Sequence, residues 1–304
     1  MTGFWSGEYR AQKGDVSLYM LRKRTEAPDA GGRKPLLFLV HGSSFSGPSG
    51  FDLHVPGKPG YSLMETFAAF GFDVWTLDHE GYGKSDSTDG NSNIAEGVKD
   101  LRAGMEVVRR ETGQDSCAFY GSSSGALRAA CFAEAKPGAV SKLILDAFVW
   151  TGEGSPTLKE RAKKLDQWRA SSMRPVDRAF FRSIFTRDMP GTSEEGVADA
   201  LADTELAICN QVPTGTYLDM CAHLPVCDPK KVQCPVLIIR GEHDGIATEE
   251  DLLAYFRELP NRDKQFVIIP GQAHVSHLGL NRGRFHHVLR EFLTMPERAD
   301  GSPG

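Results

Sequence analysis

Residues 118–130 read Ala-Phe-Tyr-Gly-Ser-Ser-Ser-Gly-Ala-Leu-Arg-Ala-Ala: a strand-like run, a glycine–serine turn and then strong helix formers. The turn has the pattern G-x-S-x-G between a strand and a helix, where it presents a serine hydroxyl clear of the sheet. Small residues are needed on either side because the turn is too tight for bulky side chains. Only Ser123 has glycine at both flanking positions, so the pattern predicts Ser123 as a nucleophile. Taken alone, it also fits a loop without function.

Two later strand-like runs end in polar residues. The run from Pro235 to Arg240 continues into Gly-Glu-His-Asp244, and the run from Phe266 to Ile269 continues into Pro-Gly-Gln-Ala-His274. The carboxyl ends of parallel strands lie at one edge of a sheet, where ligands bind. The chain order Ser, Asp, His is that of serine hydrolases on such sheets. We therefore predict a triad in which His274 is the general base for Ser123 and Asp244 orients the imidazole.

Two neighbouring residues are alternatives within this triad. Asp146 follows the strand-like run Lys142–Leu145 and is an alternative acid, although a polar residue at a strand end also serves as a cap. His277 lies three residues after His274, but its distance from the strand end favours His274 as the base.

Apolar runs alternate with helix-like segments along most of the chain. We predict strands at 36–40, 74–77, 117–120, 143–145, 236–239 and 266–269, and helices at 63–70, 94–110, 126–135, 249–258 and 284–293. Uninterrupted apolar runs are typical of strands buried on both faces of a parallel sheet. The alternation predicts an α/β fold with a mostly parallel central sheet flanked by helices. Residues up to about Arg24 are expected to add antiparallel edge strands.

The alternation stops between residues 151 and 231, where helix-like pieces occur without a convincing strand. We interpret this segment as an inserted helical lid. The predicted organisation is a first part of the core at 1–150, the lid at 151–231, a second part of the core at 232–296 and a flexible tail at 297–304.

Several motifs resemble those of the α/β-hydrolase superfamily, serine esterase type, over essentially the whole chain. The run Leu36–Val40 continues into His41-Gly42-Ser43-Ser44, similar to the His-Gly segment that precedes the oxyanion hole in that family. The resemblance implies an oxyanion hole made by the backbone N–H of Ser43 or Ser44 together with that of Ser124. Residues 77–85, Leu-Asp-His-Glu-Gly-Tyr-Gly-Lys-Ser, resemble the family's D-x-R-G-x-G-x-S turn, with Glu80 in place of arginine. Because glutamate is an acid and arginine a base, this difference affects which ion pairs form locally, not the fold.

A narrower likeness is carried by residues 51–75, which include Phe-Asp-Leu at 51–53, Tyr-Ser-Leu-Met at 61–64 and Gly-Phe-Asp-Val-Trp at 71–75. This segment is similar to bacterial monoalkyl phthalate hydrolases rather than to dehalogenases or epoxide hydrolases. The serine nucleophile and the single tyrosine of the predicted lid, Tyr217, also disfavour the latter two activities.

Composition excludes several classes of protein. The chain has 304 residues, a net charge of −5 and 40% hydrophobic residues, without long blocks of like charge, so a nucleic-acid partner is not expected. No apolar run is long enough to span a bilayer, and we expect a cytoplasmic protein. Six cysteines without a CxxC pair fit reduced thiols, and neither a metal site nor a cofactor is expected. The sequence does not indicate an oligomeric state.

The first half of the predicted lid is rich in basic residues. A solvated helix face is the commoner use of such residues. The alternative is that one or two arginines, with Arg161 and Arg169 as candidates, point inward and bind a substrate carboxylate. The predicted function is hydrolysis of a small or medium carboxylic ester, including a monoester with a free carboxylate. An amidase, a lactonase, a carbon–carbon bond hydrolase or a non-enzymatic ligand-binding member of the fold remain alternatives.

Overall fold

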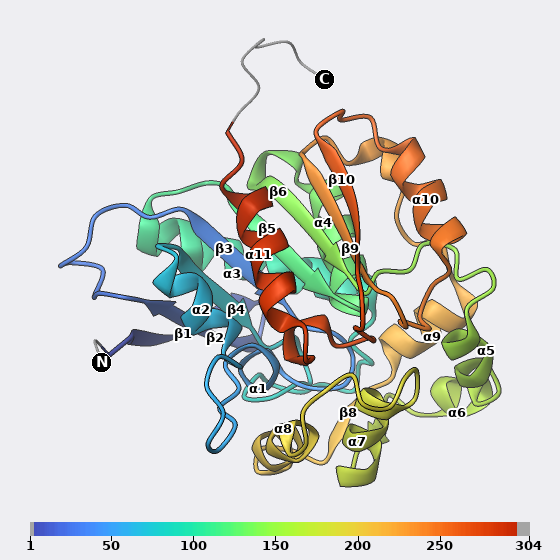
Figure 1. The fold of residues 1–304 in the computed structure, drawn as a ribbon. Coiled ribbons are helices and arrows are strands. Elements are labelled where there is room, and N and C mark those ends of the chain that lie inside the picture. The colour runs from blue at the N-terminus through green and yellow to red at the C-terminus, as the bar shows by residue number, and fades with distance from the viewer. Residues whose placement is uncertain (1–2, 297–304) are drawn as a thin grey trace.

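A central sheet of eight strands organises the computed structural model, which describes residues 3–296 (Figure 1). The strands are β1 (Trp5–Lys13), β2 (Val16–Arg24), β3 (Leu36–Val40), β4 (Asp73–Leu77), β5 (Cys117–Ser122), β6 (Val140–Asp146), β9 (Val236–Gly241) and β10 (Lys264–Ile269). Across the sheet their order is β1-β2-β4-β3-β5-β6-β9-β10. All six strands predicted within the core are present, and the opening residues form the antiparallel pair β1–β2 at one edge. β2 is also antiparallel to β4, and all the other pairs are parallel.

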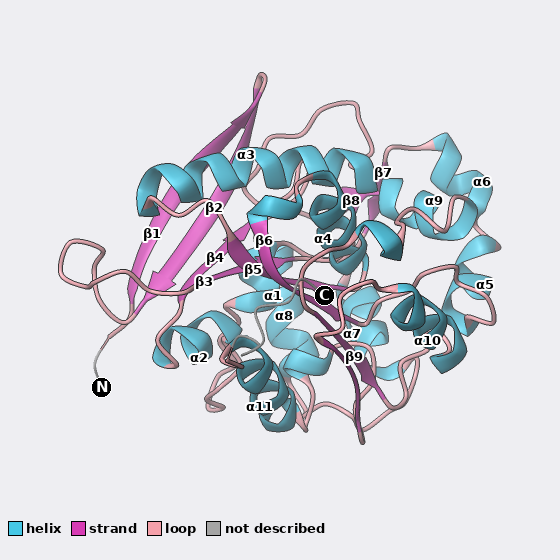
Figure 2. Cartoon of the chain, turned by 90° about the horizontal axis from the view of Figure 1, so that it is seen from above, coloured by secondary structure: helices cyan, strands magenta, loops and turns pink. Residues whose placement is uncertain are grey.

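Helices cover both faces of this sheet (Figure 2). They are the short α1 (Gly47–Phe51), then α2 (Leu63–Ala69), α3 (Ile94–Thr112), α4 (Ser124–Ala135), α10 (Glu249–Glu258) and α11 (Arg282–Leu293), with 3-10 turns at Pro137–Ala139, Pro229–Lys231 and Ser276–Leu278. Successive strand side chains point to opposite faces. In β3, Phe38 packs into a core with α3, α4 and α10, whereas Leu37 and Leu39 pack into a second core with α2 and α11. This two-sided burial explains why the central strands are continuous apolar runs.

The chain leaves the sheet between the neighbouring strands β6 and β9. We call residues 147–235 the insertion; it contains α5 (Pro156–Ala162), α6 (Leu165–Ala170), α7 (Arg178–Thr186), α8 (Val197–Leu206) and α9 (Gly215–Ala222). It also contains two strands that the sequence did not predict, β7 (Met173–Pro175) and β8 (Gln211–Pro213), paired antiparallel. Three residues ending in proline are too short to give a strand pattern. In Figure 1 the insertion gathers at one end of the sheet.

Three further observations bear on the sequence expectations. Within residues 3–296, none of the helices combines the length and apolar character needed to cross a membrane. All six cysteines are free. Glu80 pairs with Lys13 of β1 at 2.5 Å, so its carboxylate has a local cation partner. The predicted tail, residues 297–304, lies outside the described residues.

Candidate active site

Ser123 stands in the sharp turn between β5 and α4, and its backbone is strained. Its φ of 58° and ψ of −125° lie in a region that residues other than glycine rarely adopt. The turn is possible because its flanks are glycines: a Cβ on Gly121 would lie 2.5 Å from the Gly125 carbonyl oxygen, and one on Gly125 would lie 2.2 Å from the Val40 carbonyl oxygen. The two glycines thus allow α4 to start directly against β3.

The structure brings Ser123, His274 and Asp244 together at the ends of β5, β10 and β9. The Ser123 Oγ lies 3.1 Å from His274 Nε2, and His274 Nδ1 lies 2.9 Å from Asp244 Oδ1. Both distances are within the range for hydrogen bonds. The three side chains therefore have the mutual geometry that nucleophilic catalysis requires.

The side chain of Asp244 is ionised, and hydrogen bonds fix the turn that carries it. Burial alone would raise its pKa, but His274, the Ile246 N–H and the charge of Arg187 together outweigh burial and lower the pKa of Asp244. Its Oδ1 also accepts a hydrogen bond from the Ile246 N–H at 3.0 Å, and Arg240 Nη2 donates to the Asp244 carbonyl oxygen at 3.1 Å. An ionised Asp244 accepts from His274 Nδ1, which leaves Nε2 free to accept the Ser123 proton.

Asp146, the alternative acid, faces a different partner. The Tyr120 hydroxyl donates to Asp146 Oδ2 at 2.7 Å, and the carboxyl group is fully buried. Burial, which outweighs the Tyr120 hydrogen bond, raises the pKa of Asp146 to about 7. Its backbone contributes nonetheless, because the Ser123 N–H donates to the Asp146 carbonyl oxygen at 2.9 Å. Asp244, and not Asp146, is thus the acid that contacts His274.

From the raised pKa of Asp146 we predict how the stability of the protein to unfolding depends on pH. The pKa of Asp146 is about 7 in the folded protein and 3.8 ordinarily, so between these values the carboxyl group stays protonated when folded but ionises when unfolded. The stability that the protonated group contributes is therefore fully present below about pH 4 and is lost as the pH rises towards 7. We expect the wild type to lose stability relative to Asp146→Asn over this interval, with a constant difference above it. Urea unfolding of both proteins between pH 4 and 8 measures this, and a difference independent of pH would contradict it.

His277 also lies apart from the triad contacts. It sits in the 3-10 turn Ser276–Leu278 and packs against Phe51 and Phe285 as a buried core residue. Burial lowers the pKa of His277 to about 3, so it is uncharged at neutral pH.

The loop after β3 passes beside the nucleophile and is fixed by His41. The His79 backbone N–H donates to His41 Nε2 at 3.0 Å, which places the ring proton on Nδ1, 2.7 Å from the Gly42 carbonyl oxygen. Burial lowers the pKa of His41, which keeps this neutral form. A Cβ on Gly42 would lie 3.2 Å from Ser123 Cβ, so the loop approaches the nucleophile closely.

Ser43, Ser44 and Ser124 are predicted to form the oxyanion hole, and they lie where the loop after β3 passes close to Ser123. Ser43 and Ser44 border a void of about 20 Å³ beside Ser123 and His274. Ser124 is the first residue of α4, and the first N–H groups of a helix have no acceptor within it. Its N–H therefore has no acceptor within α4.

A larger cavity of about 820 Å³ adjoins this void. Arg161 and Arg187 line both spaces. Arg174, Tyr217 and His243 line the larger one, so the insertion and the loop carrying Asp244 both contribute to it. Figure 1 shows the helices of the insertion near the end of the sheet where β9 and the loop after it lie.

The two arginines predicted to face a substrate point in different directions. Arg161 of α5 lines both spaces, whereas Arg169 of α6 is not among their lining residues, and the expectation that it points inward needs correction. Its side chain is 57% exposed and pairs with Asp166 at 3.5 Å. The chain turns between α5 and α6, so Arg169 is directed to solvent.

Sequence reasoning missed two residues that lie close to the triad. Asp188, after α7, has a carboxylate oxygen within 4.8 Å of the ligand atoms of both Asp244 and His274. Its neighbour Arg187 pairs with it at 3.5 Å and lines the void at Ser123. Neither belongs to a motif, and only the general basic character of the segment pointed to Arg187.

Two groups among residues 3–296 have the spacing to hold a metal ion. In the first, formed by Asp52, His54 and Glu65, Lys23 Nζ lies 2.6 Å from Asp52 and 2.8 Å from Glu65, so a cation already neutralises the carboxylates. In the second, Asp188 joins Asp244 and His274, whose facing atoms are engaged with each other. Neither group offers an uncommitted set of ligands.

Comparisons with known proteins agree with this architecture. The sequence model of the family described as serine aminopeptidase, S33, matches residues 60–279. A thermophilic esterase from Thermogutta terrifontis has a similar structure, with a TM-score of 0.69 and 19% identity over 94% of this chain and 98% of that one. A carboxylesterase structure from Nitrososphaera gargenis gives a TM-score of 0.69 at 15% identity over 95% and 98% of the chains. Comparison with curated protein sequences gave no match.

Proposed function

The chain belongs to the serine aminopeptidase S33 family of α/β-hydrolases, and we propose that it hydrolyses small or medium carboxylic esters through an acyl-serine intermediate. The observation that carries the proposal is the continuous contact from Ser123 Oγ to His274 at 3.1 Å and from His274 to Asp244 at 2.9 Å. The void bordered by Ser43 and Ser44 lies beside the same hydroxyl and supports an oxyanion hole there.

The proposed reaction follows from these contacts. His274 Nε2 takes the Ser123 proton while Oγ attacks the ester carbonyl carbon. Backbone N–H groups of Ser43 or Ser44 and of Ser124 bind the resulting oxyanion. His274 then gives its proton to the departing alcohol, and a water molecule activated by the same imidazole releases the acid and restores Ser123. Asp244 stabilises the imidazolium in both halves of the reaction.

The family description raises an aminopeptidase as a second candidate. An aminopeptidase binds a substrate ammonium group, for which an acidic recess is suitable. The cavity here is lined by Arg161, Lys164, Arg174 and Arg187 against Glu160 and Asp188, so its balance is basic. This charge favours neutral or anionic esters over a free amino terminus. Lactone and carbon–carbon bond hydrolysis would use the same triad.

Release of nitrophenolate from a 4-nitrophenyl ester tests the proposal. We expect many turnovers per chain, because the triad can both form and hydrolyse the acyl-serine, and slower cleavage of the matched 4-nitroanilide. A protein that only binds ligands would release at most one nitrophenolate per chain. Faster cleavage of the anilide would favour the amidase alternative.

A further inference from the structure

Two consecutive backbone N–H groups beside Ser123 have no acceptor in the protein. Ser43 and Ser44 border the void at the nucleophile. Among residues 3–296, neither of these two N–H groups donates a hydrogen bond to a backbone or side-chain acceptor. Ser43 is buried, and a buried backbone N–H is normally paired. Unpaired donors at the edge of this void are suited to bind the oxyanion of a tetrahedral intermediate.

The carbonyl groups of the same loop are bound. His41 Nδ1 donates to the Gly42 carbonyl oxygen at 2.7 Å, and Arg174 Nη2 donates to the Ser43 carbonyl oxygen at 2.8 Å. In a planar trans peptide the C=O and the N–H point in opposite directions. A hydrogen bond that fixes the Ser43 carbonyl therefore also fixes the direction of the Ser44 N–H. His41 belongs to the core, whereas Arg174 belongs to β7 of the insertion.

Aromatic rings of the insertion hold the Arg174 side chain in place. Its guanidinium carbon lies 4.1 Å from the centre of the Tyr217 ring and 4.8 Å from that of the Phe180 ring. These rings come from α9 and α7, and β7 itself is paired with β8. Arg174 is buried as well. The packing of the insertion therefore sets the position of the donor to the Ser43 carbonyl oxygen.

Arg174 also brings a charge to this carbonyl. Within the described part of the chain, residues 3–296, no carboxylate pairs with Arg174, and its Nε is buried without a hydrogen-bond partner. A hydrogen bond from an ionised donor is roughly twice as strong as one between neutral groups. A carbonyl that accepts such a bond is polarised, which makes the N–H of the same peptide a stronger donor. The contact thus affects both the direction and the strength of the Ser44 N–H.

We propose that Arg174 is a positioning residue for the oxyanion hole: from the insertion it holds the Ser43–Ser44 peptide so that the Ser44 N–H faces the void at Ser123. The inference rests on the proposed ester hydrolysis and names a residue outside the triad on which that reaction depends. Arg174 does not line the void itself, so it acts through the peptide rather than on the reacting atoms. The insertion therefore completes the reaction centre as well as lining the larger cavity.

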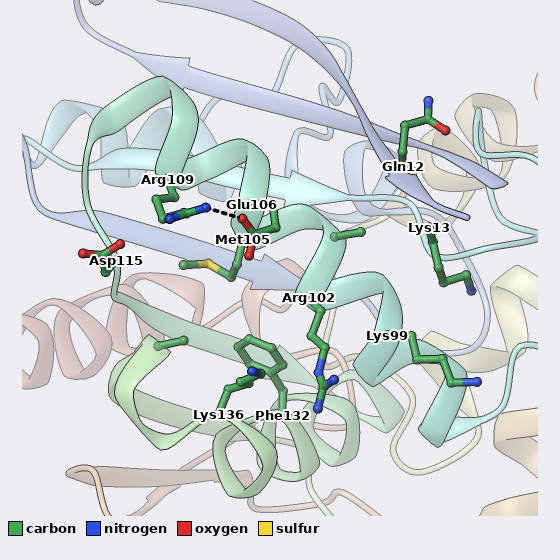
Figure 3. A pocket seen from close by; sticks show the side chains of 12 residues that line it. Gln12, Lys13, Lys99, Arg102, Met105, Glu106, Arg109, Asp115, Phe132 and Lys136 are labelled. Carbon is green, nitrogen blue, oxygen red and sulfur yellow. Dashed lines mark hydrogen bonds and ion pairs between the residues drawn. The ribbon is translucent and has the colours of Figure 1, made fainter. Parts of the chain in front are cut away.

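An arginine elsewhere in the chain provides a matched control. Figure 3 shows a hollow of about 490 Å³ next to α3, which Arg102 helps to line. Arg102 is exposed, and this hollow shares no lining residue with the void at Ser123 or with the larger cavity. Arg102→Met thus removes the same charge by the same substitution at a place without contact to the loop after β3.

Hydrolysis of a neutral ester, 4-nitrophenyl pentanoate, by Arg174→Met is the first test. The Ser43–Ser44 peptide should lose its fixed direction while the triad remains, so kcat should fall by roughly ten- to a hundred-fold. KM should change by less than about two-fold, because an oxyanion donor acts in the transition state rather than on the bound ester. Arg102→Met should match the wild type in both constants.

A pair of inhibitors distinguishes this role from a role in shaping the cavity. Butyl trifluoromethyl ketone has the acyl chain of the same ester; Ser123 Oγ adds to its carbonyl carbon as the hydroxyl proton passes to His274, and the resulting oxyanion occupies the oxyanion hole. The corresponding secondary alcohol has the same chain but cannot be attacked. In Arg174→Met the inhibition constant of the ketone should rise by the factor by which kcat/KM falls, and that of the alcohol should stay within about two-fold.

The outcomes separate this inference from the proposed function. If folded Arg174→Met keeps kcat within about two-fold of the wild type, or if ketone and alcohol lose affinity equally, the positioning role is overturned while ester hydrolysis stands. If the wild type does not turn over the ester, the proposed function itself fails, and this inference with it.

Arg174→Lys covers the case in which circular dichroism shows that Arg174→Met does not fold. Lysine keeps the charge, but its shorter side chain cannot maintain the 2.8 Å contact with the Ser43 carbonyl oxygen in the same geometry. We expect kcat to fall by roughly three- to ten-fold, with a matching loss of affinity for the ketone alone. Wild-type kinetics in Arg174→Lys, or an equal loss for both inhibitors, would overturn the proposal.

Discussion

Ser123→Ala is expected to reduce ester hydrolysis by about 10⁴- to 10⁶-fold, the loss found when the nucleophile of a serine hydrolase triad is removed. The reason is that Ser123 Oγ is the atom 3.1 Å from His274 Nε2, and alanine offers no atom to attack the carbonyl carbon. Steady-state kinetics with a 4-nitrophenyl ester measures the effect. Because alanine experiences the same backbone strain as serine at φ 58°, the fold and the cavity should be retained.

The neighbouring serines are matched controls. The Ser124 hydroxyl is buried without a hydrogen-bond partner, so Ser124→Ala removes an unsatisfied group and leaves the backbone N–H in place. Ser122→Ala likewise leaves the elbow intact. An organophosphonate should label the wild type, Ser122→Ala and Ser124→Ala, but not Ser123→Ala. Near-normal turnover by Ser123→Ala, or labelling of Cys117 or Cys131, would show that the nucleophile has been misassigned.

The features that the sequence predicts well are those set by local patterns. Continuous apolar runs such as 36–40 indicate strands buried on both faces, because any polar side chain there would lose water without gaining a partner. Gly121 and Gly125 identify the elbow because any Cβ would meet backbone atoms. The ends of β9 and β10 then place Asp244 and His274 on the edge that holds Ser123.

The features that the sequence does not predict depend on how short helices pack. Arg161 and Arg169 look equivalent in a basic, amphipathic segment, but α5 and α6 are separate helices that direct their side chains differently. Arg161 meets Tyr217, which α9 brings from a distant part of the chain. Asp188 reaches the triad from a loop after α7, and a lone aspartate in a loop carries no pattern. Side-chain direction in the insertion is therefore tertiary information.

Asp244→Asn is expected to lower kcat by about 10⁴-fold, the loss seen when the acid of a serine protease triad becomes an amide. Asparagine keeps the shape of the side chain but has only one oxygen and no charge, and Asp244 Oδ1 contacts both the Ile246 N–H at 3.0 Å and His274 Nδ1 at 2.9 Å. A neutral amide does not stabilise the imidazolium, and an amide N–H placed at the Oδ1 position requires the ring proton to sit on Nε2. The imidazole then cannot take the Ser123 proton, while substrate binding is little affected.

The comparison variants distinguish the acids that surround His274. Asp146→Asn should keep most activity, because its carboxyl group contacts Tyr120 rather than His274. Asp188 lies within 4.8 Å of the facing atoms of Asp244 and His274, so residual activity in Asp244→Asn that disappears in the double variant with Asp188→Asn would identify Asp188 as the substitute acid. The assignment of Asp244 would be wrong if Asp146→Asn lost 10³-fold or more in kcat while Asp244→Asn remained near the wild type. Because the pKa of Asp244 is lowered, its carboxylate stays ionised down to acidic pH, and the difference between wild type and Asp244→Asn should hold throughout pH 6 to 9.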